Sequence, residues 1–214
     1  MRSPLIALLL GSLLIAGCKR NEAKGQTGSG TGSTVHTEGN DTEREQARFD
    51  AERHPEKVIE ALGIKPGSKV ADVGAGSGLL TVHLARAVKP NGKVVATDID
   101  EGVLELMQSR LQAAGLADYV DRKVVEADTP GLEKNEYDAI LLAEVDHYFS
   151  DPVTWLRTAA QSLKPGGRLV ISNRIHHRAK SIAAATKAGL KTVSESTPVP
   201  SHFIAVFMVP EGTK

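Results

Sequence analysis

The chain has 214 residues and a mass of 22.7 kDa, which is enough for one α/β domain of ordinary size. Its 26 basic and 26 acidic residues balance, so no basic excess is available to neutralise the phosphates of a nucleic acid. A hydrophobic fraction of 41% and a charged fraction of 24% exclude a wholly disordered chain and a multispanning membrane protein. We expect a globular domain with no nucleic-acid partner; the composition does not fix its oligomeric state.

Residues 1–18 have the pattern of an export signal. Arg2 precedes an apolar run from Leu5 to Ala16, and Lys19 ends the run before the ~20 residues that a membrane-spanning helix needs. The segment Leu14-Ile15-Ala16-Gly17-Cys18 resembles the lipobox of bacterial lipoproteins, in which the cysteine is lipidated and becomes the first residue after cleavage. The resemblance implies a lipid anchor at Cys18, the single cysteine of the chain, and a membrane-anchored lipoprotein of the bacterial cell envelope, on its periplasmic or outer-membrane face. An ordinary secretory signal with an incidental cysteine is the alternative, and an unused signal would leave the protein in the cytoplasm.

A polar tether is expected between the signal and the folded domain. Residues 19–40 include a stretch from Gly25 to Gly39 that is rich in glycine, serine and threonine and has no hydrophobic period. We place the domain at residues 41–214. Its first segment, from Asp41 to Leu62, is expected to be helical with a break near Pro55.

From Ser68 onward short apolar runs alternate with helical patterns, which is typical of a parallel sheet with crossover helices. The expected strands are Lys69–Val73, Lys93–Ile99, Arg122–Ala127, Tyr137–Val145 and Arg168–Ser172. The expected helices are Leu79–Val88, Gly102–Ala114, Pro152–Leu163 and Ala179–Ala188. Leu190–Glu195 and His202–Val209 leave no room for a helix between them, so they pair as an antiparallel couple. The predicted fold is α/β: a Rossmann-like, seven-stranded mixed sheet with helices on both faces.

A glycine-rich loop follows the first expected strand, in the segment Asp72-Val73-Gly74-Ala75-Gly76-Ser77-Gly78. Glycines at such a strand-to-helix turn allow the backbone to approach a ligand closely. The dinucleotide fingerprint requires a glycine three positions after its second one, but Leu79 stands there, which disfavours NAD and FAD. Asp98 ends the second strand, where a carboxylate can accept both hydroxyls of an adenosine ribose.

These motifs resemble those of the class I S-adenosylmethionine-dependent methyltransferases, over about residues 57–210. Asp72 to Gly78, including Gly74, Ala75 and Gly76, is similar to the first cofactor motif of that family. The resemblance implies that S-adenosyl-L-methionine is the cofactor. It also implies the following contacts: the ribose with Asp98, the adenine face with Ile99, the adenine amino group with Asp128, and the cofactor with Glu144 at the end of the fourth-strand motif.

Candidate catalytic residues follow the fourth strand. The segment Asp146-His147-Tyr148-Phe149-Ser150-Asp151-Pro152 resembles the His-bearing segment of ubiquinone and menaquinone C-methyltransferases, which act on small molecules. In an open α/β sheet the ligand lies at the carboxyl ends of the strands, so we expect His147, with Asp146 beside it, to face the methyl acceptor as a general base. A hydrogen-bonded structural histidine is the other interpretation. Nothing here has the spacing of a known metal-ligand set, and no metal is expected.

The leading hypothesis is therefore a membrane-tethered methyltransferase for an unidentified small-molecule acceptor. Its difficulty is that S-adenosylmethionine is made and used in the cytoplasm, whereas a processed lipoprotein lies outside the inner membrane. A binding lipoprotein that keeps the fold without catalysis is the alternative. The intact glycine motif and Asp98 argue against such decay, and Leu79 disfavours a third possibility, a nicotinamide oxidoreductase.

Overall fold

The computed structural model describes residues 38–212. The expected export signal, Cys18 and the larger part of the expected tether lie outside these residues. Helix α1 spans Glu38–Arg53, so residues 38–40, which we expected in the tether, are helical instead. Among the described residues no helix is both long enough and apolar enough to cross a membrane.

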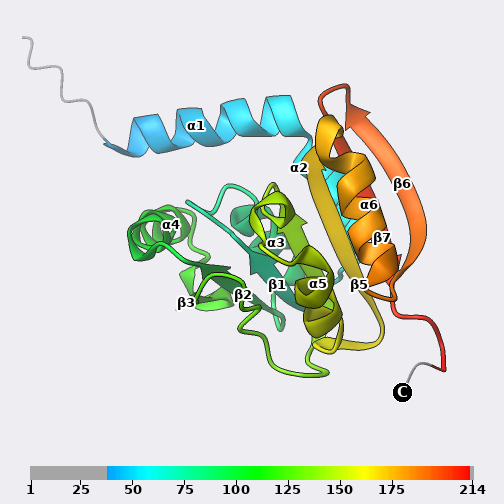
Figure 1. The fold of residues 1–214 in the computed structure, drawn as a ribbon. Helices are drawn as coiled ribbons and strands as arrows, with labels where there is room; N and C mark the ends of the chain where they lie inside the picture. The colour runs from blue at the N-terminus through cyan, green and yellow to red at the C-terminus, as the bar shows by residue number, and fades with distance from the viewer. Residues whose placement is uncertain (1–37, 213–214) are drawn as a thin grey trace, which may run out of the picture. The chain divides into compact units, whose positions relative to one another are not determined.

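A single seven-stranded sheet forms the centre of the described unit, with strand order β3-β2-β1-β4-β5-β7-β6 (Figure 1). Its strands are β1 (Lys69–Val73), β2 (Lys93–Asp98), β3 (Val120–Val124), β4 (Tyr137–Ala143), β5 (Leu163–Arg174), β6 (Lys191–Val199) and β7 (His202–Met208). Strands β1 to β5 are parallel, and β7 runs antiparallel to both β5 and β6. The predicted mixed sheet with a C-terminal antiparallel pair is confirmed.

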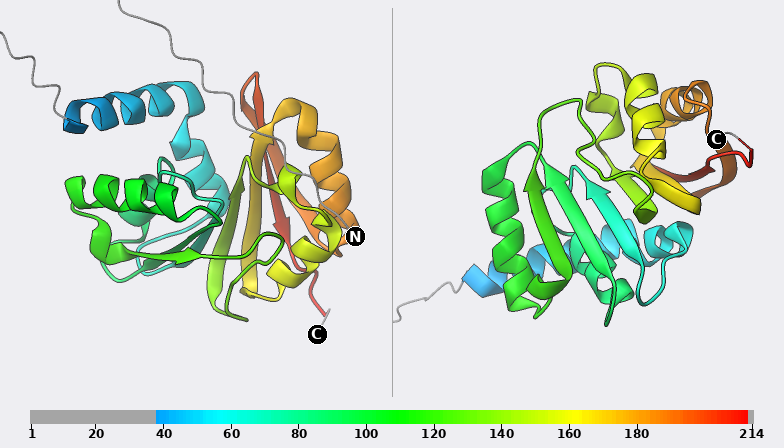
Figure 2. Two further views of the ribbon diagram at one scale, coloured as in Figure 1. Left: turned by 60° about the vertical axis from the view of Figure 1, so that its left-hand side comes forward. Right: turned by 90° about the horizontal axis from the view of Figure 1, so that it is seen from below.

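Helices cover both faces of this sheet, as Figure 2 shows. The helices are α1, α2 (Pro55–Leu62), α3 (Thr81–Val88), α4 (Glu101–Ala113), α5 (Pro152–Ala160) and α6 (Arg178–Lys187), with short 3-10 turns η1 (Ala117–Tyr119), η2 (Asp146–Tyr148) and η3 (Ile175–His177). Because side chains alternate along a strand, the sheet has two separate apolar clusters. Val70 and Leu141 pack with α2, α3 and α4 on one face, and Ala71 and Leu142 pack with α5 and α6 on the other.

Two boundaries have clear local causes. His54 has a left-handed backbone (φ 50°) between α1 and α2, and Pro55 begins α2, so the helix break predicted near Pro55 is confirmed. Residues 164–167, which separate the helix and the strand predicted there, lie inside β5 as an irregularity, because Tyr137 pairs with Leu163 whereas Ala139 pairs with Arg168. Strand β5 therefore starts at Leu163, five residues before the expected Arg168.

Candidate functional site

The glycine loop joins β1 to α3 in a conformation that favours glycine. Gly74, Gly76 and Gly78 have φ angles of 65°, 55° and 86°, all in the left-handed region. A Cβ at Gly78 would lie 2.6 Å from Met107 Cγ, so this glycine is needed for packing against α4. A Cβ at Gly76 would have no atom within 4 Å. The backbone at Gly76 is therefore open to a ligand.

Asp98 lies at the end of β2, directly against this loop. Its Oδ2 accepts a hydrogen bond from the Gly76 N–H at 2.9 Å, and its Oδ1 accepts one from the Asp100 N–H at 3.1 Å. The next residue, Ile99, leaves 65% of its surface exposed. The Asp98 carboxylate, the exposed Ile99 side chain and the open backbone of Gly76 thus lie together. The arrangement fits S-adenosylmethionine, which the motif resemblance implies.

Asp72 ends β1 beneath the loop and is almost completely buried, with 2% of its surface exposed. Its Oδ2 accepts a hydrogen bond from the Thr81 hydroxyl at 2.7 Å, at the start of α3. Burial, together with the nearby charge of Asp98, raises the pKa of Asp72 to about 6, although the Thr81 hydrogen bond opposes this rise. Asp72 therefore fixes the end of β1 to α3 from below the loop.

Two other expected cofactor residues have protein partners. Asp128, with φ 62°, is exposed and accepts a hydrogen bond from the Ser150 N–H at 2.8 Å, which lowers its pKa. Glu144, with φ 54°, pairs with Arg53 of α1 and lies 3.2 Å from Arg174 Nε. Burial favours the neutral form of Glu144, but the charge and hydrogen bond of Arg53, together with His202 and Arg174, outweigh burial, so the pKa of Glu144 is lowered. Both acids connect segments that surround the carboxyl end of the sheet.

Asp146 and His147 meet a buried asparagine, Asn173, which begins the polar segment that follows the fifth expected strand. Asn173, near the end of β5, is completely buried and donates from Nδ2 to Asp146 Oδ1 at 2.6 Å. The same Nδ2 lies 3.0 Å from His147 Nδ1. Asp146 Oδ2 accepts a hydrogen bond from the Ser181 hydroxyl of α6. The signal in the sequence is the polar pair Ser172-Asn173, which directly follows the apolar run Leu169–Ile171 of β5.

Helix α1 is attached to the loop through a group of residues that sequence reasoning missed. Arg110 of α4, 7% exposed, donates from Nε to the Ser77 carbonyl at 2.9 Å and also pairs with Glu45 of α1. Gln46 of α1 donates to the Leu79 carbonyl at 3.1 Å. An arginine among the buried positions of α4 was a sign of such a role, because a buried guanidinium needs acceptors.

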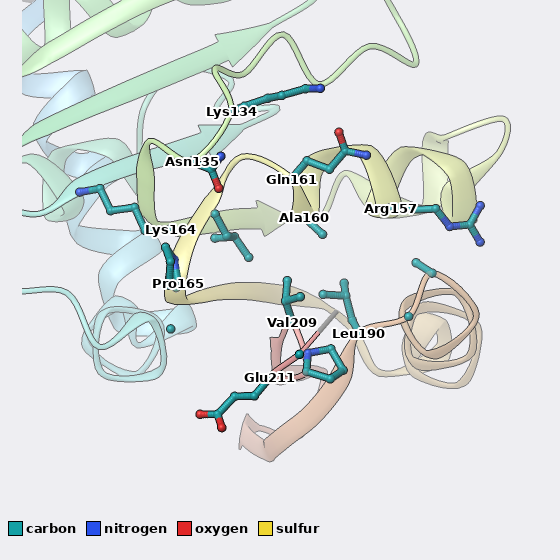
Figure 3. Close-up of a pocket in the computed structure, with 17 residues that line it drawn as sticks. Lys134, Asn135, Arg157, Ala160, Gln161, Lys164, Pro165, Leu190, Val209 and Glu211 are labelled. Atoms are coloured by element: carbon teal, nitrogen blue, oxygen red, sulfur yellow. The ribbon is translucent and has the colours of Figure 1, made fainter. Parts of the chain in front are cut away.

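Two cavities lie at opposite ends of the sheet. A small one, of about 160 Å³, is at the carboxyl end beside η2 and α6, and is lined by Asp146, His147, Phe149, Pro152, His177, Lys180, Ser181 and Ala184. A larger one, of about 790 Å³, lies where β5 begins and β7 ends, between residues such as Lys164 and Val209 (Figure 3). The larger cavity is remote from the glycine loop. Asp146 and His147, the expected catalytic residues, line the smaller cavity.

Comparison with known proteins agrees with this geometry. Residues 71–169 match the family model described as "Methyltransferase domain". This segment, which contains the glycine loop, Asp98 and His147, is thus similar to a methyltransferase domain.

Relatives of this chain include a ubiquinone/menaquinone biosynthesis C-methyltransferase of Ectopseudomonas mendocina. It is 34% identical over 114 residues, which is 53% of this chain and 44% of the relative. The chain thus matches less than half the length of this curated relative.

Solved structures share the fold of this chain. A methyltransferase from Aquifex aeolicus that depends on S-adenosylmethionine has a TM-score of 0.70 at 23% identity, covering 80% of this chain and 98% of that one. The [4+2]-cyclase SpnF has a TM-score of 0.60 at 19% identity, covering 68% and 60%. Because a cyclase has the same fold, the likeness in structure does not define the reaction.

Proposed function

We propose that this protein uses S-adenosylmethionine to methylate a small-molecule acceptor. The observation that carries the proposal is the grouping of the open Gly76 backbone, the Asp98 carboxylate and the exposed Ile99 at one end of the sheet. The cofactor, when bound, supplies an electrophilic methyl group on a sulfonium. The protein then has to position and desolvate the reactants, and no protein nucleophile is required.

Residues at the end of β2 and in the glycine loop would bind the cofactor, and residues that follow β4 would bind the acceptor. Asp98 and the glycine loop would hold the nucleoside part, while Asp72 and Arg110 keep that loop in place from below and from the side. The polar group of Asp146, His147 and Asn173 lines or supports the neighbouring cavity, where the acceptor would bind. The Ectopseudomonas relative is named for quinone biosynthesis, so quinols are the first acceptors to test.

Calorimetric titration of the full chain tests the cofactor assignment. We expect saturable binding of S-adenosylmethionine and none of NAD, since Leu79 replaces a glycine of the dinucleotide fingerprint. Screening quinols, phenols and small acids for release of S-adenosylhomocysteine then tests transfer. Binding of the cofactor without transfer to any acceptor would favour the non-catalytic alternative, and binding of NAD alone would refute the proposal.

We also propose that Cys18 anchors the protein to a bacterial envelope membrane. The support is the sequence of the lipobox-like segment that ends at Cys18, together with the polar stretch that follows it. Cys18→Ser should abolish incorporation of labelled fatty acid and block cleavage before residue 18. A Cys18→Ser protein that is still processed and still fractionates with membranes would contradict the anchor.

A further inference from the structure

The hydrogen bonds of Asn173 determine which way its side-chain amide faces. Its Oδ1 accepts from the Arg174 backbone N–H at 2.7 Å, and its Nδ2 donates to the Asp146 carboxylate at 2.6 Å. A backbone N–H can only donate and a carboxylate can only accept. If the amide oxygen and nitrogen were exchanged, the NH₂ group would face the Arg174 N–H and the carbonyl oxygen would face the Asp146 carboxylate, and neither pair could form a hydrogen bond. The position of Nδ2 is therefore fixed by two independent partners.

This orientation determines the proton position on His147. The amide nitrogen of asparagine is a donor and has two hydrogens, of which one is used for Asp146. The other meets His147 Nδ1 at 3.0 Å, so Nδ1 has to accept it. A neutral imidazole carries one N–H, and with Nδ1 as the acceptor the proton is on Nε2. A proton added at Nδ1 would face the Asn173 N–H and break that hydrogen bond.

The groups around the His147 ring come from three elements. Asp146 and Tyr148 are its neighbours in η2, with the Tyr148 ring centroid at 4.0 Å. The His177 ring of η3 stacks on it at 4.2 Å, with 16° between the ring planes, and the ring centroids of His176 and His177 lie 4.0 Å apart. Lys180 of α6 lines the same cavity. The one acid in this group, Asp146, already accepts hydrogen bonds from Asn173 and Ser181.

We infer that Asn173 holds His147 as a neutral Nε2–H hydrogen-bond donor, and that His147 binds an anionic oxygen of the acceptor instead of taking a proton from it. This inference deepens the proposed function and replaces the general-base role expected from the sequence. Charge then balances without a proton transfer to the protein. An acceptor anion and a methyl sulfonium enter, and a neutral methylated acceptor and a neutral thioether leave.

The tautomer can be measured without any activity. Nitrogen NMR of the full chain at pH 7.5 should show a proton on His147 Nε2 and none on Nδ1, with the signals assigned by their loss in His147→Gln. Asn173→Asp replaces the donor with an acceptor and should move the proton to Nδ1. A proton on Nδ1 in the unsubstituted chain would overturn the inference even if methyl transfer is found. This measurement uses the unsubstituted chain, so it does not depend on whether the Asn173 variant folds.

The donor role is tested with 4-nitrophenol as a probe, because its anion absorbs visible light. In the presence of S-adenosylhomocysteine, binding should favour the anion and lower the pH at which the bound probe ionises. His147→Gln keeps an N–H donor and should retain the preference for the anion. His147→Phe keeps a ring that can stack on His177 but has no donor, so its preference for the anion over the neutral probe should fall about 10-fold. Equal loss in both variants, or no preference for the anion in the unsubstituted chain, would overturn the donor role.

Discussion

The Asp98 carboxylate accepts a hydrogen bond from the Gly76 N–H at 2.9 Å, linking the end of β2 to the middle of the glycine loop. Oδ1 of the same carboxylate accepts from the Asp100 N–H, at the start of α4. Its position is thus set before any ligand binds. Preorganisation of this kind reduces the ordering cost of binding.

Removing this carboxylate should weaken binding of S-adenosylmethionine. Asp98→Ala removes charge-assisted hydrogen bonds of about 1.5–3 kcal/mol, so the dissociation constant should rise about ten- to hundredfold. Calorimetric titration measures the change. Asp118→Ala, at an exposed aspartate in η1, is the matched control and should bind like the unsubstituted chain. If Asp98→Ala also titrates like the unsubstituted chain, Asp98 does not bind the ribose.

Two glycines of the loop should respond differently to alanine. Gly78→Ala places a Cβ 2.6 Å from Met107 Cγ at φ 86°, so it should lower the free energy of unfolding by about 2 kcal/mol or more. Gly76→Ala meets no atom within 4 Å and should cost only about 1 kcal/mol for its φ of 55°.

The affinity for S-adenosylmethionine should also differ between these two variants, but here Gly76→Ala should show the larger loss. A methyl group at Gly76 would occupy the space we assign to the ligand, so Gly76→Ala should lose most of its binding while it remains folded. Urea unfolding and calorimetric titration of both variants provide the two measurements. A Gly76→Ala chain with normal affinity would show that the ligand does not approach this part of the loop.

The buried Asp72 should make stability depend on pH. Its pKa is raised from 3.8 to about 6, so between these values the folded chain binds a proton that the unfolded chain has released. The free energy of unfolding that Asp72 contributes therefore falls as pH rises from about 4 to 6, by about 3 kcal/mol in total. Asp72→Asn cannot ionise and should gain stability relative to the unsubstituted chain over this window.

Urea unfolding of both chains at half-unit steps from pH 4 to 7.5 measures that difference. Carboxylates that do not interact with Asp72 contribute equally in the two chains and cancel. The exposed Asp118→Asn variant should show a difference that does not vary with pH. Parallel curves for Asp72→Asn and the unsubstituted chain would mean that Asp72 ionises normally in the folded state.

Arg110 should support the glycine loop through the shape of its guanidinium group. Arg110→Lys keeps the charge but cannot reach Ser77, Gln46 and Glu45 at once, so we expect a loss of about 2 kcal/mol in unfolding free energy and weaker binding of S-adenosylmethionine. Arg86→Lys changes an exposed arginine of α3 in the same way and should be neutral. Unchanged affinity in Arg110→Lys would mean that the loop holds its shape without this contact.

The fold was predictable because the strands and helices of the domain alternate along the chain, each with its own apolar periodicity. The strand predicted at Lys69–Val73 has the predicted bounds, and the helices predicted at Gly102–Ala114 and Ala179–Ala188 are displaced by one residue at each end. The third strand begins at Val120, two residues before the expected Arg122, because Val120 is the one buried residue among its five and the strand gives a weak apolar signal. Apolar periodicity thus locates elements better than it locates their ends.

The site was predictable only where its residues form a contiguous motif. The glycine loop and Asp98 can be read in order along the chain, since they follow two neighbouring strands. Asn173 and Arg110 act through partners 26 to 68 residues away, at His147, Ser77 and Thr42. Local patterns contain no information on such pairs, because only the assembled sheet brings them together.

Helix α1 has consequences for the timing of ligand exchange. Phe49 packs against the apolar core, and the helix also makes polar contacts to Arg110, His83, Leu79 and Glu144. Polar contacts that water can replace hold a helix less firmly than buried apolar area does, and salt screens them. Detachment of α1 should therefore become faster as ionic strength rises, while the sheet beneath it stays intact. We therefore expect the rate at which small molecules reach the glycine loop to depend on the salt content of the surroundings, and the survival of the fold to depend on the two apolar clusters.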